Sequence, residues 1–254
     1  MRPPDYVSPD GRHRAWSGDA LLELRGLTAE ALGEEISAVI IDPPYCSGGL
    51  SATERKRSVQ GKYGIVGGFE GDWRDQRAFG QWLALLLAIA YRSTAEGGRC
   101  WVWTDWRQLP TMSDALQAAG WVWVGLTPWV KAPGKYRNAK GSAGAQCEYL
   151  LWGSKGRPWS TRADVDAPAL PGVLTGDVPR GEQKRHGAEK PVSALASIMR
   201  LLPPDALVLD FFAGSGSTAE AAGIAGHRSI SIEVDPAVVE GVFVSRFDGR
   251  LFAD

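Results

Sequence analysis

Two short stretches of the chain carry side chains that could do chemistry. The first, Val39-Ile40-Ile41-Asp42-Pro43-Pro44-Tyr45, is an apolar run that ends on a carboxylate, two prolines and an aromatic ring. The prolines cannot donate hydrogen bonds to a sheet, so the strand stops there and Asp42 lies at its carboxyl end, where open α/β sheets bind ligands. A carboxylate, free carbonyl oxygens and an aromatic face are suited to gripping a planar ring that bears an amine. The plain alternative is a Pro-Pro turn with a solvated Asp42.

The second stretch is a glycine-rich turn between a predicted strand and a predicted helix. Residues 206–210 form a buried apolar run that ends on Asp210 and is followed by Phe211-Phe212-Ala213-Gly214-Ser215-Gly216-Ser217-Thr218. Glycines in such a turn let backbone N–H groups approach a nucleotide-like ligand closely. The next apolar run ends on Glu233, about 20 residues after the glycines, where nucleotide-binding folds place the acid that holds ribose hydroxyls. This spacing favours an adenosine-like ligand over a simple N-cap role for Asp210.

The composition is that of an ordinary globular protein. The chain has 254 residues, 44% hydrophobic and 22% charged, with a formal net charge of −1, enough for one α/β domain with a modest insertion. Cys46, Cys100 and Cys147 are far apart and form no C-x-x-C pair, so we expect no metal site and no disulfide framework. Neither an apolar leader nor an apolar run long enough for a bilayer is present, so we expect a cytoplasmic protein without a membrane partner.

The elements that must position these residues alternate between strand and helix patterns. This alternation predicts a mostly parallel sheet covered on both faces. We expect helices over residues 20–32 with Asp19 as N-cap, 76–95 with Gly97-Gly98 at its end, 109–119, 192–202 and 219–226. We expect strands over residues 15–17, 39–41, 100–104, 121–126, 148–152, 206–210 and 229–235, with their tryptophans in the core, and a polar arm over residues 1–14.

Two stretches lack regular patterns. Residues 46–75 are polar and rich in glycine, with basic residues between Arg55 and Lys62, and predict a mobile loop that closes over the ligand of the Pro-Pro turn. Residues 131–187 contain irregular inserts. Between Lys131 and Arg162, seven Lys or Arg residues face one acidic residue, Glu148, for a local charge of about +6. Such charge is often only solvated surface, but it also predicts a phosphate-contacting surface and a small target-recognition region.

Together these motifs resemble those of the amino-methylating DNA methyltransferases, adenine-N6 or cytosine-N4, of the permuted beta-type subgroup whose catalytic motif precedes its cofactor motif. The resemblance rests on Asp42-Pro43-Pro44-Tyr45, on residues 209–218, 232–236 and 186–192, and on Gly18-Asp19. It covers residues 15–153 and 186–247. The chain departs from the family at Phe211, where proline is more common, and in lacking a long target-recognition domain. The resemblance implies one domain over residues 15–254 with a Rossmann-like α/β fold and a mostly parallel, seven-stranded sheet.

The resemblance also implies S-adenosylmethionine as cofactor and DNA as partner, with the target base flipped out of the duplex. The implied catalytic motif is Asp42, Pro43, Pro44 and Tyr45, in which Asp42 and the Pro43 carbonyl accept the amine N–H groups and Tyr45 stacks on the base. The implied cofactor contacts are Asp19 near the adenine amine, Lys190 and Pro191 at the methionine end, Asp210, the turn of Phe212, Ala213, Gly214, Ser215, Gly216 and Ser217, and Glu233 on the ribose. A homodimer is compatible with these features.

The target base and the class of activity each keep an alternative. Aspartate at the first position of the catalytic motif is typical of adenine-N6 enzymes and serine of cytosine-N4 enzymes, so we expect adenine, with cytosine as the alternative. A nucleotide-binding oxidoreductase would explain the glycine turn but would leave Asp42 and Tyr45 without a role. A non-catalytic DNA-binding module on the same scaffold is opposed by the full set of motifs.

Overall fold

The computed structural model describes residues 2–45, 74–132, 141, 143–162, 165–176 and 189–247. The strands are β1 (Tyr6–Val7), β2 (His13–Ser17), β3 (Ile36–Ile41), β4 (Thr94–Thr104), β5 (Val122–Val130), β6 (Cys147–Ser154), β7 (Leu207–Asp210) and β8 (Arg228–Glu233). The helices are α1 (Ala20–Gly26), α2 (Ala29–Leu32), α4 (Gln76–Ser93), α5 (Leu109–Ala118), α6 (Val192–Met199), α7 (Ser217–Ile224), α8 (Pro236–Val238) and α9 (Val244–Phe247), with a 3-10 turn η1 (Trp159–Thr161) and a π-helical turn η3 (Val239–Phe243).

Within the described residues, eight strands form one sheet in the order β1-β2-β8-β7-β3-β4-β6-β5. The five strands from β2 to β4 in this order are parallel to their neighbours, whereas β6 runs antiparallel to both β4 and β5. The α/β fold with a largely parallel sheet is therefore as expected. The count of seven strands is exceeded by β1, which adds an antiparallel edge beside β2.

The prediction of a polar arm over residues 1–14 is wrong, because the polar side chains of this segment bind it to the edge of the sheet. Asp5 accepts a hydrogen bond from the Ser17 amide at 2.7 Å and one from Arg2 Nη1 at 2.8 Å. Arg2 also pairs with Glu23 of α1 at 3.0 Å. Polar composition here serves edge pairing rather than solvation.

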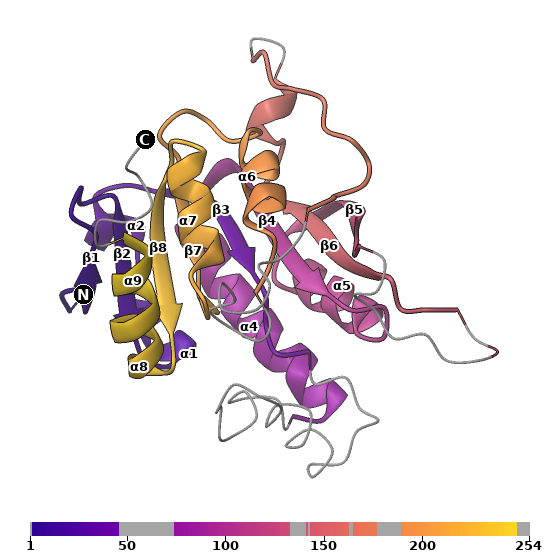
Figure 1. Cartoon of the computed structure of the whole chain (residues 1–254), viewed down its shortest axis with the longest axis horizontal. Helices are drawn as coiled ribbons and strands as arrows, with labels where there is room; N and C mark the ends of the chain where they lie inside the picture. The colour runs from indigo at the N-terminus through magenta and orange to yellow at the C-terminus, as the bar shows by residue number, and fades with distance from the viewer. Residues whose placement is uncertain are drawn as a thin grey trace.

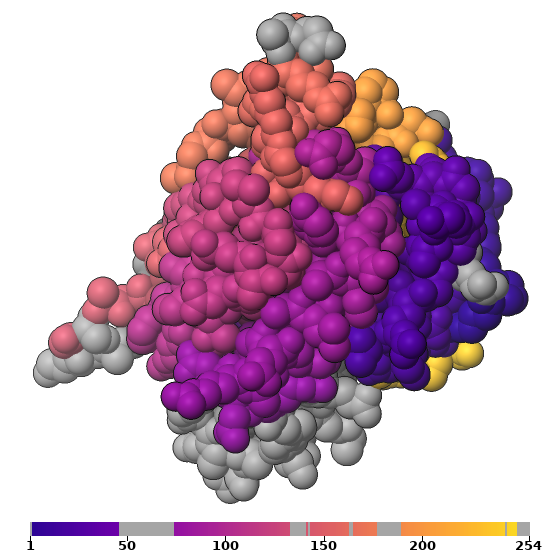
Figure 2. Space-filling view, turned by 180° about the vertical axis from the view of Figure 1, so that it is seen from behind, coloured from indigo at the N-terminus to yellow at the C-terminus, as the bar shows by residue number. Residues whose placement is uncertain are grey.

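Helices cover both faces of the sheet, and strand residues alternate between them. Figure 1 shows α6 and α7 in front of the sheet, and Figure 2, seen from behind, shows α4 and α5 over the reverse face. In β3, Val39 and Ile41 pack with α4 and α5, whereas Ala38 and Ile40 pack with α6 and α7. This period of two is what a strand buried on both faces requires, and it fixes the register that delivers Asp42 to the sheet edge.

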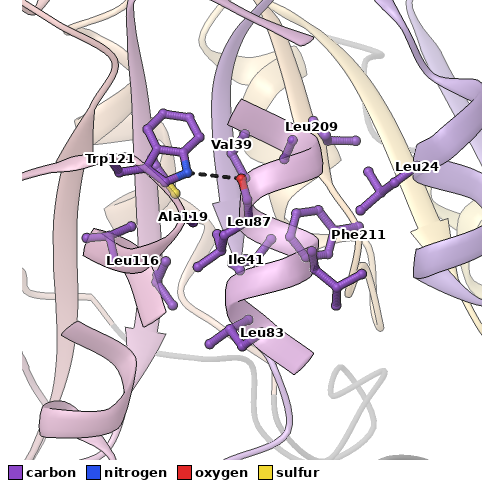
Figure 3. Close-up of a cluster of buried hydrophobic side chains, with 14 of the residues drawn as sticks. Leu24, Val39, Ile41, Leu83, Leu87, Leu116, Ala119, Trp121, Leu209 and Phe211 are labelled. Atoms are coloured by element: carbon purple, nitrogen blue, oxygen red, sulfur yellow. Dashed lines mark hydrogen bonds between the residues drawn. The ribbon is translucent and has the colours of Figure 1, made fainter. Parts of the chain in front are cut away.

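The cluster under α4 also satisfies the polar end of a large aromatic side chain. Leu83 and Leu87 of α4 face Val39 of the sheet, and the Trp121 indole nitrogen donates to the Leu87 carbonyl oxygen at 3.1 Å (Figure 3). Most strand tryptophans are core residues, as expected. Trp123 on edge strand β5 is the exception, with 43% of its surface exposed.

Several helix boundaries differ from expectation. Helix α6 ends at Met199 and not at residue 202, and α7 covers Ser217–Ile224 and not residues 219–226. The helix expected over residues 20–32 is divided into α1 and α2, because the Thr28 side chain accepts a hydrogen bond from the Ala31 amide and starts a new helix. Gly97-Gly98 lies inside β4 instead of ending α4. The end of α4 is stabilised by Lys155, whose Nζ donates to the carbonyl oxygens of Tyr91 and Thr94 at 3.1 and 2.6 Å.

No helix among the described residues combines the length and the apolar character needed to cross a membrane.

Candidate active site

The two chemically suggestive stretches meet at the point where the direction of the sheet's connections reverses. Strand β3 lies beside β7, with Val39 paired to Leu209, although the two strands come from opposite ends of the sequence. From β3 the chain passes through α4 to β4 on one side, and from β7 through α7 to β8 on the other. Right-handed crossovers in opposite directions place α4 and α7 on opposite faces, so the strand ends diverge here and leave room for a ligand. Asp42 and Asp210 flank this point.

One carboxylate oxygen of Asp42 contacts a lysine, and the other has no hydrogen-bond donor among the described residues. Lys190 Nζ lies 2.5 Å from Asp42 Oδ2. Asp42 Oδ1 is buried and has no hydrogen-bond partner among the described residues. Burial raises the pKa of Asp42, and the neighbouring Lys190 opposes that rise. A buried carboxylate oxygen without a donor costs free energy, and an incoming N–H group would remove this cost.

Glu148 links three other side chains at the same edge. Its Oε2 accepts a hydrogen bond from the Tyr45 hydroxyl at 3.2 Å and lies 3.3 Å from Lys190 Nζ, while its Oε1 lies 2.7 Å from Lys131 Nζ. Burial alone would raise the pKa of Glu148, but Lys190 and Lys131 together lower it to about 2. Burial beside Asp42 and Glu148 raises the pKa of Tyr45, so its hydroxyl stays protonated and donates.

Glu148 is a site residue that the sequence reasoning missed. It lies at the start of β6, and β6 is antiparallel to β4, with Thr104 paired to Tyr149. The amino end of an antiparallel strand meets the carboxyl ends of its parallel neighbours, so Glu148 reaches the same edge as Asp42. A signal was present in the sequence, because no helix is expected between residues 126 and 148 and parallel strands need a crossover connection.

The glycine turn after β7 is closed by its own hydrogen bonds. The Phe212 amide donates to Asp210 Oδ1 at 2.9 Å, and the Gly216 amide donates to the Ala213 carbonyl oxygen at 2.8 Å. Two further amides donate to strand β8: that of Ala213 to the Ile232 carbonyl oxygen at 3.0 Å and that of Gly214 to Glu233 Oε2 at 2.7 Å. The buried hydroxyls of Ser215 and Ser217 lie 2.9 Å from each other. These four amides are therefore occupied within the fold. The turn offers close approach to its backbone instead, as at Gly214, which has φ +45° and no atom nearer than 3.9 Å to a Cβ built there.

Glu233 and Asp19 lie next to each other because β2 pairs with β8, with Ser17 opposite Glu233. The Gly18 amide donates to the Glu233 carbonyl oxygen at 2.8 Å. Asp19 is the N-cap of α1, as predicted, and accepts from the Leu21 and Leu22 amides. Besides Gly214, the Asp235 amide donates to the Glu233 carboxylate, at 3.1 Å. Both predicted cofactor contacts thus end neighbouring strands.

Asp210 stands between two other carboxylates. Burial raises its pKa to about 7, despite hydrogen bonds from Thr218 and the Phe212 amide, and the charges of Asp42 and Glu233 act in the same direction as burial. This edge of the sheet therefore concentrates negative charge. A bound cation would relieve the repulsion.

The remaining predicted residues border these carboxylates. Phe212 lies beside Trp82 of α4, with ring centroids 5.5 Å apart, and the Arg74 guanidinium lies 4.1 Å from the Trp82 ring. Pro191 is the N-cap of α6. Lys190, which the family resemblance places at the methionine end of the cofactor, contacts the catalytic motif through Asp42 and lies 5.5 Å from the centroid of the Tyr45 ring.

A buried arginine from the far end of the sequence supports both halves of the site, and sequence reasoning did not single it out. Arg246 of α9 donates to the Ser215 carbonyl oxygen inside the glycine turn. It also pairs with Glu189 at 2.5 Å and contacts Glu220 of α7. Because Glu189 precedes Lys190, Arg246 links the glycine turn to the residue that contacts Asp42.

The predicted basic surface is divided by the direction of β6. Lys131 follows β5 at the edge that holds Asp42, whereas Lys155, Arg157 and Arg162 follow β6 at the opposite edge, where the Gly97 amide donates to the Lys155 carbonyl oxygen. The described basic residues of this stretch therefore lie at two opposite edges of the sheet. Outside the described residues lie Lys135, Arg137, Lys140, residues 46–73 with the Arg55–Lys62 cluster, and residues 177–188 with the His186 motif start.

No metal site emerges in the part of the chain that the structure describes, where no three His, Cys, Asp or Glu side chains could hold an ion together. Cys100 and Cys147 are free thiols.

Comparison with known proteins agrees with this geometry. The sequence matches the DNA methylase family over residues 36–244. YubD of Escherichia coli (strain K12) is 30% identical over 205 residues, which cover 80% of this chain and 78% of that protein. Among solved structures, the PvuII DNA methyltransferase (cytosine-N4-specific) has a TM-score of 0.72 at 19% identity, covering 99% of this chain and 91% of that one. TTHA0409 of Thermus thermophilus, in complex with S-adenosyl-L-methionine, has a TM-score of 0.60 at 20% identity, with coverage of 94% and 96%.

The structural neighbours confirm the expected α/β methyltransferase fold. The family match over most of the chain, together with the relative at 30% identity, shows that this protein belongs to the DNA methylase family of N6 and N4 amino-methyltransferases.

Proposed function

We propose that this DNA amino-methyltransferase transfers a methyl group from S-adenosylmethionine to the exocyclic N6 amine of adenine in DNA. The observation that carries the proposal is the buried, unpartnered Oδ1 of Asp42 at the reversal point of the sheet. An acceptor in that position, beside the Tyr45 ring and across from Glu233, has the chemistry needed to hold an amine against a cofactor site.

The residues present fit S-adenosylmethionine. The cofactor supplies a methyl group carried on a positively charged sulfur. The carboxylates of Asp210 and Glu233 favour such a cation, and a positive neighbour would stabilise the charged form of Asp210, whose pKa burial raises to about 7. Glu233 would accept ribose hydroxyls, Asp19 would receive the adenine amine, and the closed glycine turn would lie against the methionine part. A turn whose amides bond internally suits a cofactor that carries no phosphate.

Asp42 and the Pro43 carbonyl oxygen activate the amine by accepting its N–H groups. An exocyclic amine is a poor nucleophile because its lone pair is conjugated with the ring. When each acceptor takes one N–H, the nitrogen becomes pyramidal and its lone pair forms the new N–C bond, while the electron pair of the broken S–C bond stays on sulfur. The nitrogen then carries a positive charge, which the Asp42 carboxylate stabilises until it takes one N–H proton and passes it to water. Burial raises the pKa of Asp42 and makes it a better proton acceptor.

The Tyr45 ring provides a stacking face for the base. The amine is out of reach inside a duplex, so the base must be flipped out of the stack. The hydrogen bond from the Tyr45 hydroxyl to Glu148 fixes the orientation of the ring before the base arrives.

Adenine is favoured over cytosine because the catalytic motif begins with Asp42, as is typical of adenine-N6 enzymes. The fold does not bear on this choice, since the cytosine-N4-specific neighbour shares only 19% identity with the chain. The test is to methylate DNA with the pure protein, digest it to nucleosides and identify the product by mass spectrometry. A nucleoside of N6-methyladenine as the product supports the proposal, and one of N4-methylcytosine would overturn the adenine assignment.

A further inference from the structure

The Lys190 ammonium group is shared between two carboxylates of the site. Its Nζ lies 2.5 Å from Asp42 Oδ2 and 3.3 Å from Glu148 Oε2, and only 9% of the lysine side chain is exposed. Lysine has three donors on a flexible stem, so a small rotation moves its charge from one acceptor to the other. The described site thus contains one cation in contact with two carboxylates.

The position of this cation matters for the reaction proposed above. The amine gains positive charge as the N–C bond forms. An ammonium group held on Asp42 cancels much of the carboxylate's field and opposes that charge. The same ammonium group held on Glu148 leaves both oxygens of Asp42 available to the amine.

Glu148 is built to receive the lysine. Its side chain is 18% exposed, and Lys131 Nζ, 2.7 Å from Oε1, fixes the carboxylate so that Oε2 faces Lys190. The Tyr45 hydroxyl donates to the same oxygen at 3.2 Å, so the acceptor is already oriented. Glu148 lies in none of the sequence motifs that carry the family resemblance.

We propose that Glu148 is a positioning residue for methyl transfer, which draws the Lys190 ammonium group away from Asp42 when the target amine binds. Both oxygens of Asp42 are then free to accept from the amine. This inference rests on the proposed function, because it concerns the step in which Asp42 accepts the amine. It adds a residue from a different strand to the four of the catalytic motif.

The test compares single-turnover methylation of DNA by the full-length protein at saturating S-adenosylmethionine. Glu148→Gln keeps the size of the side chain but removes its charge, so Lys190 stays on Asp42. We expect the rate to fall about tenfold to a hundredfold, the range for one charge-assisted hydrogen bond, with KM for S-adenosylmethionine changed less than about twofold. Glu35→Gln, at an exposed glutamate before β3, is the matched control and should keep the full rate.

A double-variant comparison separates positioning from a structural effect. If Glu148 acts through Lys190, Glu148→Gln added to Lys190→Met should change the rate less than about threefold. Glu148→Gln added to Tyr45→Phe should still lower the methylation rate by the full tenfold to hundredfold, because Glu148 does not act through the tyrosine hydroxyl. Equal losses in the parent and Lys190→Met backgrounds, or a loss that vanishes only with Tyr45→Phe, would overturn the inference.

The activity of the parent protein separates a failure of the proposed function from a failure of the role of Glu148. A parent that binds S-adenosylmethionine but methylates no DNA base rejects the proposed function. An active parent with a fully active Glu148→Gln variant leaves the proposed function standing and rejects the role of Glu148.

Discussion

Arg246 of α9 and Glu189, the residue before Lys190, form an ion pair of 2.5 Å in which the two side chains are 0% and 1% exposed. The same guanidinium group donates to the Ser215 carbonyl oxygen of the glycine turn. The cofactor turn and the residue that contacts Asp42 therefore share one support. Its position is set by a helix that follows both of them in sequence.

Removing Arg246 should destabilise the protein strongly. Arg246→Met leaves the Glu189 carboxylate buried without its cation, and breaking a buried pair in this way costs about 3–5 kcal/mol. Urea denaturation should show this loss in the free energy of unfolding. Arg25→Met, at an exposed arginine of α1, is the control. Equal stability of the two variants would contradict a buried pair.

Asp42→Ala should slow methylation without weakening cofactor binding. The variant loses a charge-assisted acceptor worth about 1.5–3 kcal/mol, so turnover should fall at least about tenfold to a hundredfold. Radiolabel transfer measures the rate, and calorimetry with S-adenosylmethionine measures the affinity. Asp114→Ala, at an exposed aspartate of α5, should match the parent. A fully active Asp42→Ala protein would remove Asp42 from the mechanism.

Asp210 should make the folded state less stable as pH rises from about 4 to about 7. Burial raises the pKa of Asp210 from 3.8 to about 7, so in this interval the folded protein binds a proton that the unfolded chain has released. Stability then falls by up to about 1.4 kcal/mol per pH unit. His13 acts in the opposite sense, because burial lowers its pKa from 6.5 to about 4. The unfolded chain binds that proton first, so this contribution to stability rises with pH.

The contributions of Asp210 and His13 to the pH dependence of stability are separated by comparing the parent with Asp210→Asn. Denaturant melts across this pH range should show the variant gaining stability relative to the parent as pH rises. A constant difference between the two proteins would mean that Asp210 titrates normally.

Substitutions at two glycines of the same turn should affect different properties, cofactor binding at Gly214 and stability at Gly216. Gly214→Trp fills the space beside the turn and should abolish S-adenosylmethionine binding in calorimetry. Gly216→Ala places its Cβ 3.3 Å from Arg246 Cδ and the Phe243 ring, so it should lower the free energy of unfolding by about 1–3 kcal/mol. Gly226→Ala, with φ +76° and no atom within 4 Å of its Cβ, shows the cost of backbone strain alone. Undiminished affinity in Gly214→Trp would place the cofactor elsewhere.

The basic residues between Lys131 and Arg162 should contribute unequally to DNA binding. Changing Lys135, Arg137 and Lys140 to Glu should weaken binding and flatten its dependence on salt, by about one unit of slope per lost phosphate contact. Changing Arg157 and Arg162 to Glu, which follow β6 at the edge of the sheet opposite to Asp42, should leave the slope unchanged. Fluorescence anisotropy across a salt series gives both slopes, and a reversed pattern would place the DNA at the edge that holds Arg157 and Arg162.

The sequence predicted those parts of the site that depend on strand ends. Asp42, Asp210 and Glu233 each follow an apolar run, and in a parallel sheet such positions converge at one edge. Glu148 and Arg246 were missed because their places depend on the direction of β6 and on the docking of α9. The lack of a crossover helix before β6 was the one signal for its direction, and no local pattern reveals where α9 docks. The internal hydrogen bonds of the glycine turn were missed for the same reason, since their acceptors include Glu233 and Ile232 of another strand.

The pairing of β2 with β8 and of β3 with β7 also constrains how the chain acquires its structure during synthesis. Ser17 pairs with Glu233 and Val39 with Leu209. Strands β2 and β3 therefore cannot complete their pairing until the ribosome has made β8 and β7. At about 5–20 residues per second this delay is about 10–40 s, during which one edge of β3 has no partner strand. An open apolar edge is prone to pairing with other chains. A ribosome-bound chain that stops before β7 should therefore display Asp42 on an unfinished sheet that binds no cofactor.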